Sequence, residues 1–187
     1  SGIQIDTNHR TQSWKMVNVS AGGYCLLWDN AETTRSQVGE LLGIREESDP
    51  DTFHWRLGTI RWLKYADKRG LELGVQMLSP GAVAIAGRPD QAHMKGETYI
   101  RGLLLPEIAS LQQDATLLLP SPPFVAGETA VINCQGKNVQ VKLTKLVENT
   151  GSFAQFQFES LGEVEPPKPK QPVKKPEPGD FDDVWEL

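Results

Sequence analysis

A cluster of small polar residues and glycines occupies residues 18–23, with the sequence Asn-Val-Ser-Ala-Gly-Gly. The side chains of Asn18 and Ser20 can hydrogen-bond to nearby backbone groups, and the pair Gly22 and Gly23 lets a ligand or another backbone approach closely. Such a stretch can hold a phosphate or a purine base. The same composition is also typical of an ordinary turn between two strands, and the residues alone leave both interpretations open.

Short β-prone segments must position this polar stretch. A run with Trp14, Met16, Val17 and Val19 leads into it, and residues 24–28 follow it. Both segments are rich in aromatic and aliphatic side chains. The pattern predicts a hairpin with the polar stretch as its turn. Further strands are expected in residues 38–45, 52–63 and 71–78, which makes about five strands in total. Five strands are enough for a small closed barrel.

The predicted strand at residues 52–63 has one face that is more apolar than the other, and this face is expected to look into the barrel. Its members are Phe53, Trp55, Leu57, Thr59, Arg61 and Leu63. Arg61 lies near the end of the strand. From there its side chain either reaches the mouth of the barrel, as a candidate ligand-binding group, or extends into solvent.

The succession of motifs resembles that of PilZ domains, which are small bacterial β-barrels. Asn18-x-Ser20-x-x-Gly23 is similar to the Asp/Asn-x-Ser-x-x-Gly signature of that family, and the three strands that follow resemble its later strand motifs. The resemblance covers residues 12–80. Many PilZ domains bind the second messenger cyclic di-GMP, so the resemblance implies a nucleotide site at Asn18, Ser20, Gly22 and Gly23.

One motif of the nucleotide-binding members is not found in this sequence. They carry Arg-x-x-x-Arg ahead of the first strand, where the planar guanidinium groups clamp the phosphates. Arg10 is the only arginine that precedes Asn18, and we include it in the expected site. Ser1 and Gly2 resemble a cloning scar, so the chain is expected to begin inside a longer protein. Either the clamp lies in a segment that was cut away, or this is a divergent member that does not bind the nucleotide.

The second half of the chain looks like a weaker copy of the first. Residues 127–133 resemble residues 39–45, and residues 139–147 resemble residues 55–63. Between the halves, two more strands flank a short helical turn in which proline suits a first helical position. We therefore expect an all-β fold with two small PilZ-like antiparallel β-barrels in tandem. The second, degenerate barrel lacks the Asn/Asp-x-Ser-x-x-Gly motif, so no ligand is expected there.

The last part of the chain changes in composition and is rich in proline and lysine, which predicts a disordered, extended tail. Four apolar residues stand at its end, namely Phe181, Val184, Trp185 and Leu187. Their spacing suits a short helix or strand that docks in the groove of a protein partner. The alternative is that this end folds back on its own barrel.

The composition excludes several classes of function. The net charge of -5 over 187 residues argues against a nucleic-acid-binding surface, which needs a basic face. No apolar run reaches the length of a membrane span and no signal peptide is visible, so a cytoplasmic protein is expected. The histidines and the two cysteines show no metal-binding spacing and no catalytic arrangement. We expect neither an enzyme nor a bound cofactor, apart from cyclic di-GMP as a ligand.

These observations predict a lead-in at residues 1–11, PilZ-like barrels at residues 12–80 and 81–162, and a tail at residues 163–187. The favoured function is a regulatory module of a bacterial signalling protein that binds cyclic di-GMP and relays the signal to a partner. The alternative is a ligand-free, PilZ-like scaffold for protein–protein interaction. The sequence names neither the partner nor the oligomeric state.

Overall fold

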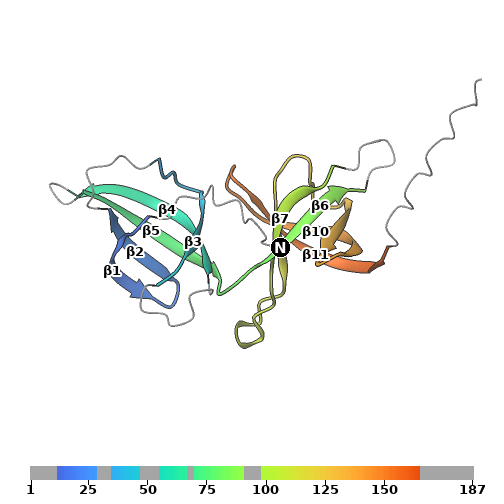
Figure 1. Cartoon of the computed structure of the whole chain (residues 1–187), viewed down its shortest axis with the longest axis horizontal. Helices are drawn as coiled ribbons and strands as arrows, with labels where there is room; N and C mark the ends of the chain where they lie inside the picture. The colour runs from blue at the N-terminus through green and yellow to red at the C-terminus, as the bar shows by residue number, and fades with distance from the viewer. Residues whose placement is uncertain (1–11, 29–34, 47–54, 67–69, 91–97, 165–187) are drawn as a thin grey trace, which may run out of the picture.

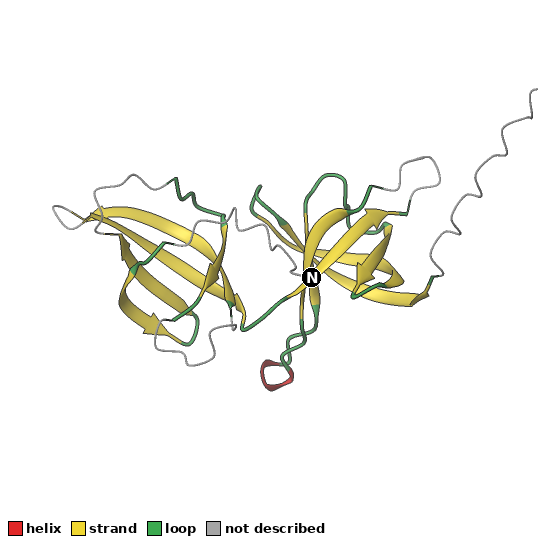
Figure 2. Cartoon of the chain, in the orientation of Figure 1, coloured by secondary structure: helices red, strands yellow, loops and turns green. Residues whose placement is uncertain are grey.

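The computed structural model describes residues 12–28, 35–46, 55–66, 70–90 and 98–164. Within them it contains eleven β-strands and one short 3-10 helix (Figure 2). The prediction of an all-β fold is confirmed. Figure 1 shows the strands gathered into two units, a sheet formed by the first five strands and a barrel formed by the others. We call these the sheet domain and the barrel domain.

The sheet domain is antiparallel, with its strands in the order β1-β2-β5-β4-β3. Its members are β1 (Lys15–Ser20), β2 (Gly23–Trp28), β3 (Leu41–Ile44), β4 (Arg56–Ala66) and β5 (Gly70–Ser79). Strands β1 and β2 form the expected hairpin, but its turn is shorter than the predicted residues 18–23. Asn18 and Ser20 pair with Cys25 and Gly23 as part of the ladder, so both belong to β1.

The sheet domain differs from the closed barrel that the sequence led us to expect. Within the described residues, β1 pairs only with β2 and β3 only with β4, so the sheet has two edges. All six residues of β1 are exposed, including Val19 at 54%. The physical reason is the pairing at the edges, because no described strand joins β1 to β3, whereas β6 makes such a join in the other domain.

The barrel domain is a closed antiparallel barrel in the cyclic order β10-β11-β8-β7-β6-β9. Its strands are β6 (Val83–Pro89), β7 (Ile100–Leu105), β8 (Thr116–Leu119), β9 (Thr129–Cys134), β10 (Lys137–Asn149) and β11 (Ala154–Glu163), with the helix η1 (Ala109–Leu111) between β7 and β8. The sequence analysis did not identify β6. This strand pairs with both β7 and β9 and thereby closes the barrel.

The two domains share a local backbone arrangement, as expected of an internal repeat. Gly39 has a φ of 87°, and its N–H donates to the Ile60 carbonyl at 2.8 Å. Gly127 has a φ of 93°, and its N–H donates to the Leu143 carbonyl at 2.6 Å. A left-handed glycine thus leads into β3 and into β9. The pairing of the strands agrees, because β9, β10 and β11 form an antiparallel meander just as β3, β4 and β5 do.

The predicted assignment of the faces of β4 is wrong, and this strand contains a bulge. Its pairing with β5 skips Leu78 of β5 between Leu57 and Gly58, and it skips Arg61 of β4 between Ile60 and Trp62. A bulge adds one residue to a strand, so the alternation of faces is reset after it. Ile60, expected on the outer face, is 0% exposed and lies in the core of the sheet domain together with Leu63. Arg61 is the extra residue of the bulge.

Three apolar clusters hold the structure together. One fills the barrel domain around Phe124 and Phe156, and one lies on the sheet domain around Ile60 and Leu73. The third cluster joins the domains, and it combines Leu41, Leu57 and Leu78 of the sheet domain with Leu103, Leu105, Leu118 and Phe153 of the barrel domain. Its buried apolar surface favours association of the two domains.

Candidate functional site

A groove of about 320 Å³ lies beside the β1–β2 hairpin. It is lined by residues from β1, β2, β4, β5 and the hairpin turn, namely Asn18, Val19, Ser20, Gly22, Gly23, Tyr24, Cys25, Arg61, Trp62, Gly74, Val75 and Gln76. We call it the hairpin groove. Its lining combines polar side chains, small residues and one large aromatic ring, which is a suitable mixture for a ligand with both phosphate and base groups.

The structure brings together five of the residues that the sequence singled out for ligand binding. Asn18, Ser20, Gly22, Gly23 and Arg61 all line the hairpin groove. They meet there because β2 and β5 pair side by side and β4 pairs with the other edge of β5. Arg10 lies outside the described residues, and so do the four apolar tail residues Phe181, Val184, Trp185 and Leu187.

Close packing of the backbone fixes the shape of the groove at Gly23. A Cβ at this position would lie 1.9 Å from the carbonyl oxygen of Val75, so only glycine fits between β2 and β5. The adjacent Gly22 accepts a hydrogen bond from the N–H of Met77 at 2.9 Å, which ties the hairpin turn to β5. The hairpin is therefore held rigidly against the strand that forms the floor of the groove.

The aromatic wall of the groove is Trp62, which was not among the predicted site residues. A Cβ on Gly74 would lie 2.1 Å from the indole Nε1 of Trp62, so the ring lies directly against the backbone of β5. Its side chain remains 43% exposed. An indole ring held in this way presents a surface on which a planar base can stack. The signal in the sequence was the Arg-Trp pair, of which we had assigned only the arginine.

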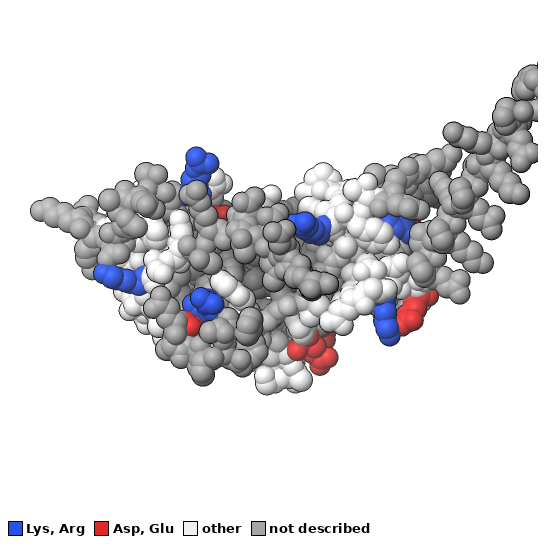
Figure 3. Space-filling view, in the orientation of Figure 1, with Lys and Arg blue, Asp and Glu red and all other residues white. Residues whose placement is uncertain are grey.

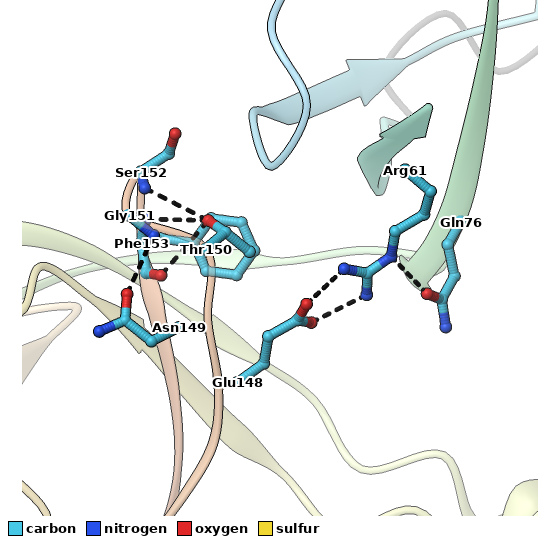
Figure 4. Close-up of polar contacts among 8 residues, drawn as sticks. All are labelled: Arg61, Gln76, Glu148, Asn149, Thr150, Gly151, Ser152 and Phe153. Carbon is cyan, nitrogen blue, oxygen red and sulfur yellow. Dashed lines mark hydrogen bonds and ion pairs between the residues drawn. The ribbon is translucent and has the colours of Figure 1, made fainter. Parts of the chain in front are cut away.

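The guanidinium group of Arg61 makes hydrogen bonds on two sides (Figure 4). Its Nε donates to Gln76 Oε1 at 2.6 Å, across the pairing of β4 with β5. Its Nη1 and Nη2 donate to the two carboxylate oxygens of Glu148, the latter at 2.9 Å. The hydrogen bonds from Arg61 lower the pKa of Glu148, and those same bonds raise the pKa of Arg61. Both groups are therefore charged at neutral pH.

Glu148 belongs to the end of β10 in the barrel domain, so this pair connects the two domains beside the groove. Sequence reasoning missed it, because nothing in the repeat indicates that a carboxylate at the end of one copy faces an arginine of the other. The sequence around Glu148 gave little indication of this contact, since an acidic residue before a Gly-containing turn is normally exposed to solvent. Only the packing of the domains reveals the contact.

One thiol also lines the hairpin groove, that of Cys25. Burial raises the pKa of Cys25, with a further contribution from Glu72, so its thiol is protonated at neutral pH. In the described part of the chain, no group of three or more His, Cys, Asp and Glu is placed to hold a metal ion. On the face shown in Figure 3, the described Lys and Arg side chains are scattered among acidic ones.

Comparison with known proteins identifies the two domains separately. Residues 3–83 match the family model described as "Cyclic-di-GMP receptor FimW, middle PilZ domain". This first domain belongs to the PilZ family. Residues 85–161 match a second family model, that of the "FimW C-terminal beta-barrel domain". The resemblance to PilZ domains inferred from the sequence is thus confirmed, and so is the presence of a second barrel.

A curated relative aligns with both the sheet domain and the barrel domain. It is the "Cyclic-di-GMP receptor FimW" of Pseudomonas aeruginosa, which is 33% identical over 183 residues. The alignment covers 95% of this chain and 30% of the relative, so the chain spans less than a third of the length of that receptor. No solved structure matches the chain. Among the described residues, no helix is both long and apolar enough to cross a bilayer.

Proposed function

We propose that this chain is a regulatory PilZ module that binds cyclic di-GMP in the hairpin groove. The observation that carries the proposal is the convergence of Asn18, Ser20 and Arg61 on one groove beside the PilZ hairpin. The similarity to a cyclic di-GMP receptor supports the same ligand. A receptor for an internal second messenger works in the cytoplasm, so the proposal includes that location.

The groove offers a complementary group for each part of such a ligand. The Ser20 hydroxyl and the Asn18 amide can donate hydrogen bonds to phosphate oxygens, and Arg61 provides a planar cation that matches a phosphodiester. Trp62 offers its exposed ring for stacking with a guanine base. Arg10, just ahead of β1, is the natural candidate for a second cationic contact. In this proposal the chain has a binding role and not a catalytic one.

Calorimetric titration of the chain with cyclic di-GMP tests the proposal, with cyclic di-AMP and GTP as ligand controls. Ser20→Ala and Arg10→Ala should each weaken binding by about 1 to 3 kcal/mol, the usual cost of losing a neutral or charged hydrogen bond. Ser160→Ala and Arg101→Ala are matched controls, because both residues are exposed on the barrel domain and outside the groove. Both controls should bind like the wild type.

Two outcomes would contradict the proposal. Absence of heat with cyclic di-GMP at millimolar concentration would reject nucleotide binding by this chain and would favour the scaffold function. Equal affinities for wild type, Ser20→Ala and Arg10→Ala would reject this groove as the site even if the ligand binds. Thermal unfolding of each variant serves as the check that the fold is intact.

A further inference from the structure

The carboxylate of Glu148 lies where a bound phosphate would be expected to interact with Arg61. Its two oxygens accept hydrogen bonds from Nη1 and Nη2, which is the bidentate geometry that arginine also forms with phosphate oxygens. Gln76 holds the third nitrogen, Nε, at 2.6 Å and so fixes the direction of the guanidinium plane. In this structure the side of Arg61 that can bind an anion in a bidentate manner is already occupied.

This contact extends to the end of the β10–β11 hairpin. We call residues 148–153 the tip loop, and Figure 4 shows it with the Arg61–Glu148 pair. Hydrogen bonds within the loop make it compact, including one from the Thr150 N–H to the Phe153 carbonyl at 3.0 Å. Phe153 is buried in the cluster that joins the domains, and a Cβ on Gly39 would lie 3.0 Å from the Thr150 carbonyl oxygen.

The tip loop is therefore attached to the sheet domain in two ways that differ in kind. The apolar attachment through Phe153 is buried and lies outside the hairpin groove. The ionic attachment through Glu148 depends on a group that also lines the hairpin groove. An anion that takes Arg61 must displace Glu148, because a guanidinium group has only one remaining bidentate side once Nε is engaged.

We propose that Glu148 is an internal competitor of the ligand phosphate, so that binding of cyclic di-GMP releases the tip loop of the barrel domain from Arg61. This inference rests on the proposed function, and it adds a route by which the PilZ domain signals to the second barrel. While Glu148 occupies Arg61, the ligand cannot bind this group, so the apparent affinity equals the intrinsic affinity multiplied by the fraction of molecules in which Arg61 is free. The barrel domain thereby sets the sensitivity of the site.

Glu148→Gln tests the competition, with Glu163→Gln as the matched control. Both changes remove one negative charge from the barrel domain, but the carboxylate of Glu163 forms its ion pair with the exposed Lys137, at 3.7 Å, and Glu163 does not line the groove. Glu148→Gln should bind cyclic di-GMP about 2- to 5-fold more tightly than wild type, as expected for release of a partly exposed ion pair. Glu163→Gln should match the wild type. In an Arg61→Ala background, the gain from Glu148→Gln should disappear.

Hydrogen exchange of a peptide spanning residues 148–153 provides a readout that does not depend on affinity. Ligand should speed exchange in the wild type, and Glu148→Gln should exchange faster even without ligand. If Glu148→Gln binds no more tightly than wild type, or more weakly, the competition is rejected while the proposed function stands. If neither protein binds at millimolar ligand, both proposals are rejected. Unchanged exchange of the tip loop on binding would reject its release.

Discussion

The close approach of β2 and β5 at Gly23 allows a sharp test of the groove geometry, because the adjacent Gly22 provides its control. Gly23→Ala would place a methyl group 1.9 Å from the Val75 carbonyl oxygen, and side-chain carbons do not approach backbone atoms closer than 3.0 Å. The strands must therefore separate by about 1 Å, because the obstructing atom belongs to a backbone that cannot rotate away. Gly22→Ala meets nothing within 4 Å.

The magnitude follows from two contributions. Overpacking a close contact costs about 1 to 3 kcal/mol, and weakening the pairing of Gly23 with Gln76 costs about 1 kcal/mol more. We expect the free energy of unfolding of Gly23→Ala to fall by about 3 kcal/mol. With a denaturant dependence of roughly 2 kcal/mol per molar urea, the unfolding midpoint moves down by about 1.5 M. Gly22→Ala should stay within about 0.5 kcal/mol of wild type.

Urea unfolding followed by tryptophan fluorescence is a suitable assay, because Trp28 lies on β2 and the indole ring of Trp62 lies against Gly74 of β5. A midpoint for Gly23→Ala within about 0.3 M of wild type would refute the close packing of β2 on β5. Equal losses in both alanine variants would refute it too, since they would indicate a general sensitivity of the hairpin turn.

Two further predictions concern charge and burial. The pKa of Glu148 is lowered by Arg61, and a carboxyl with a lowered folded-state pKa stabilises above its unfolded pKa and loses that contribution as pH falls. The stability difference between wild type and Glu148→Gln in urea should therefore shrink below about pH 4.5, and a constant difference would contradict the ion pair. Thr59 is 0% exposed, and its hydroxyl has no partner among the described residues. Thr59→Val should raise the unfolding free energy by about 1 kcal/mol, whereas a loss of that size would reveal a bond to the hydroxyl.

The sequence predicted the strand content and the polar side of the groove because both depend on local signals. Alternating apolar residues located β5, and the glycine cluster located the β1–β2 turn. The internal repeat was visible because Gly39 and Gly127 precede similar strands. Each of these patterns, including each copy of the repeat, is contained in a short stretch of consecutive residues.

The remaining features depend on geometry that no short pattern contains. The bulge at Arg61 brings Ile60 and Leu63 to the same apolar cluster although they are three positions apart in the strand, and bulges have no reliable sequence signal. Strand β6 was missed because its small residues include Ala84, Ala86 and Gly87, which give little β propensity on their own. Glu148 was missed because its partner is 87 positions away and in the other domain.

The short connection between the domains determines how far they can separate when Glu148 leaves Arg61. Only residues 80–82 lie between β5 and β6, so even a fully extended connection spans at most about 14 Å. The connection is also curled, because Ser79 Oγ donates to the Gly81 carbonyl at 2.7 Å and Pro80 restricts the backbone between them.

If the Arg61–Glu148 contact opens as proposed, the barrel domain therefore stays beside the sheet domain, held by this connection and by the apolar cluster around Phe153. Tethered this closely, Glu148 faces Arg61 at an effective concentration of about millimolar or more. Rebinding is consequently an intramolecular step whose equilibrium is independent of protein concentration. A response built on this contact depends on the amount of messenger and not on how many copies of the receptor the cell contains.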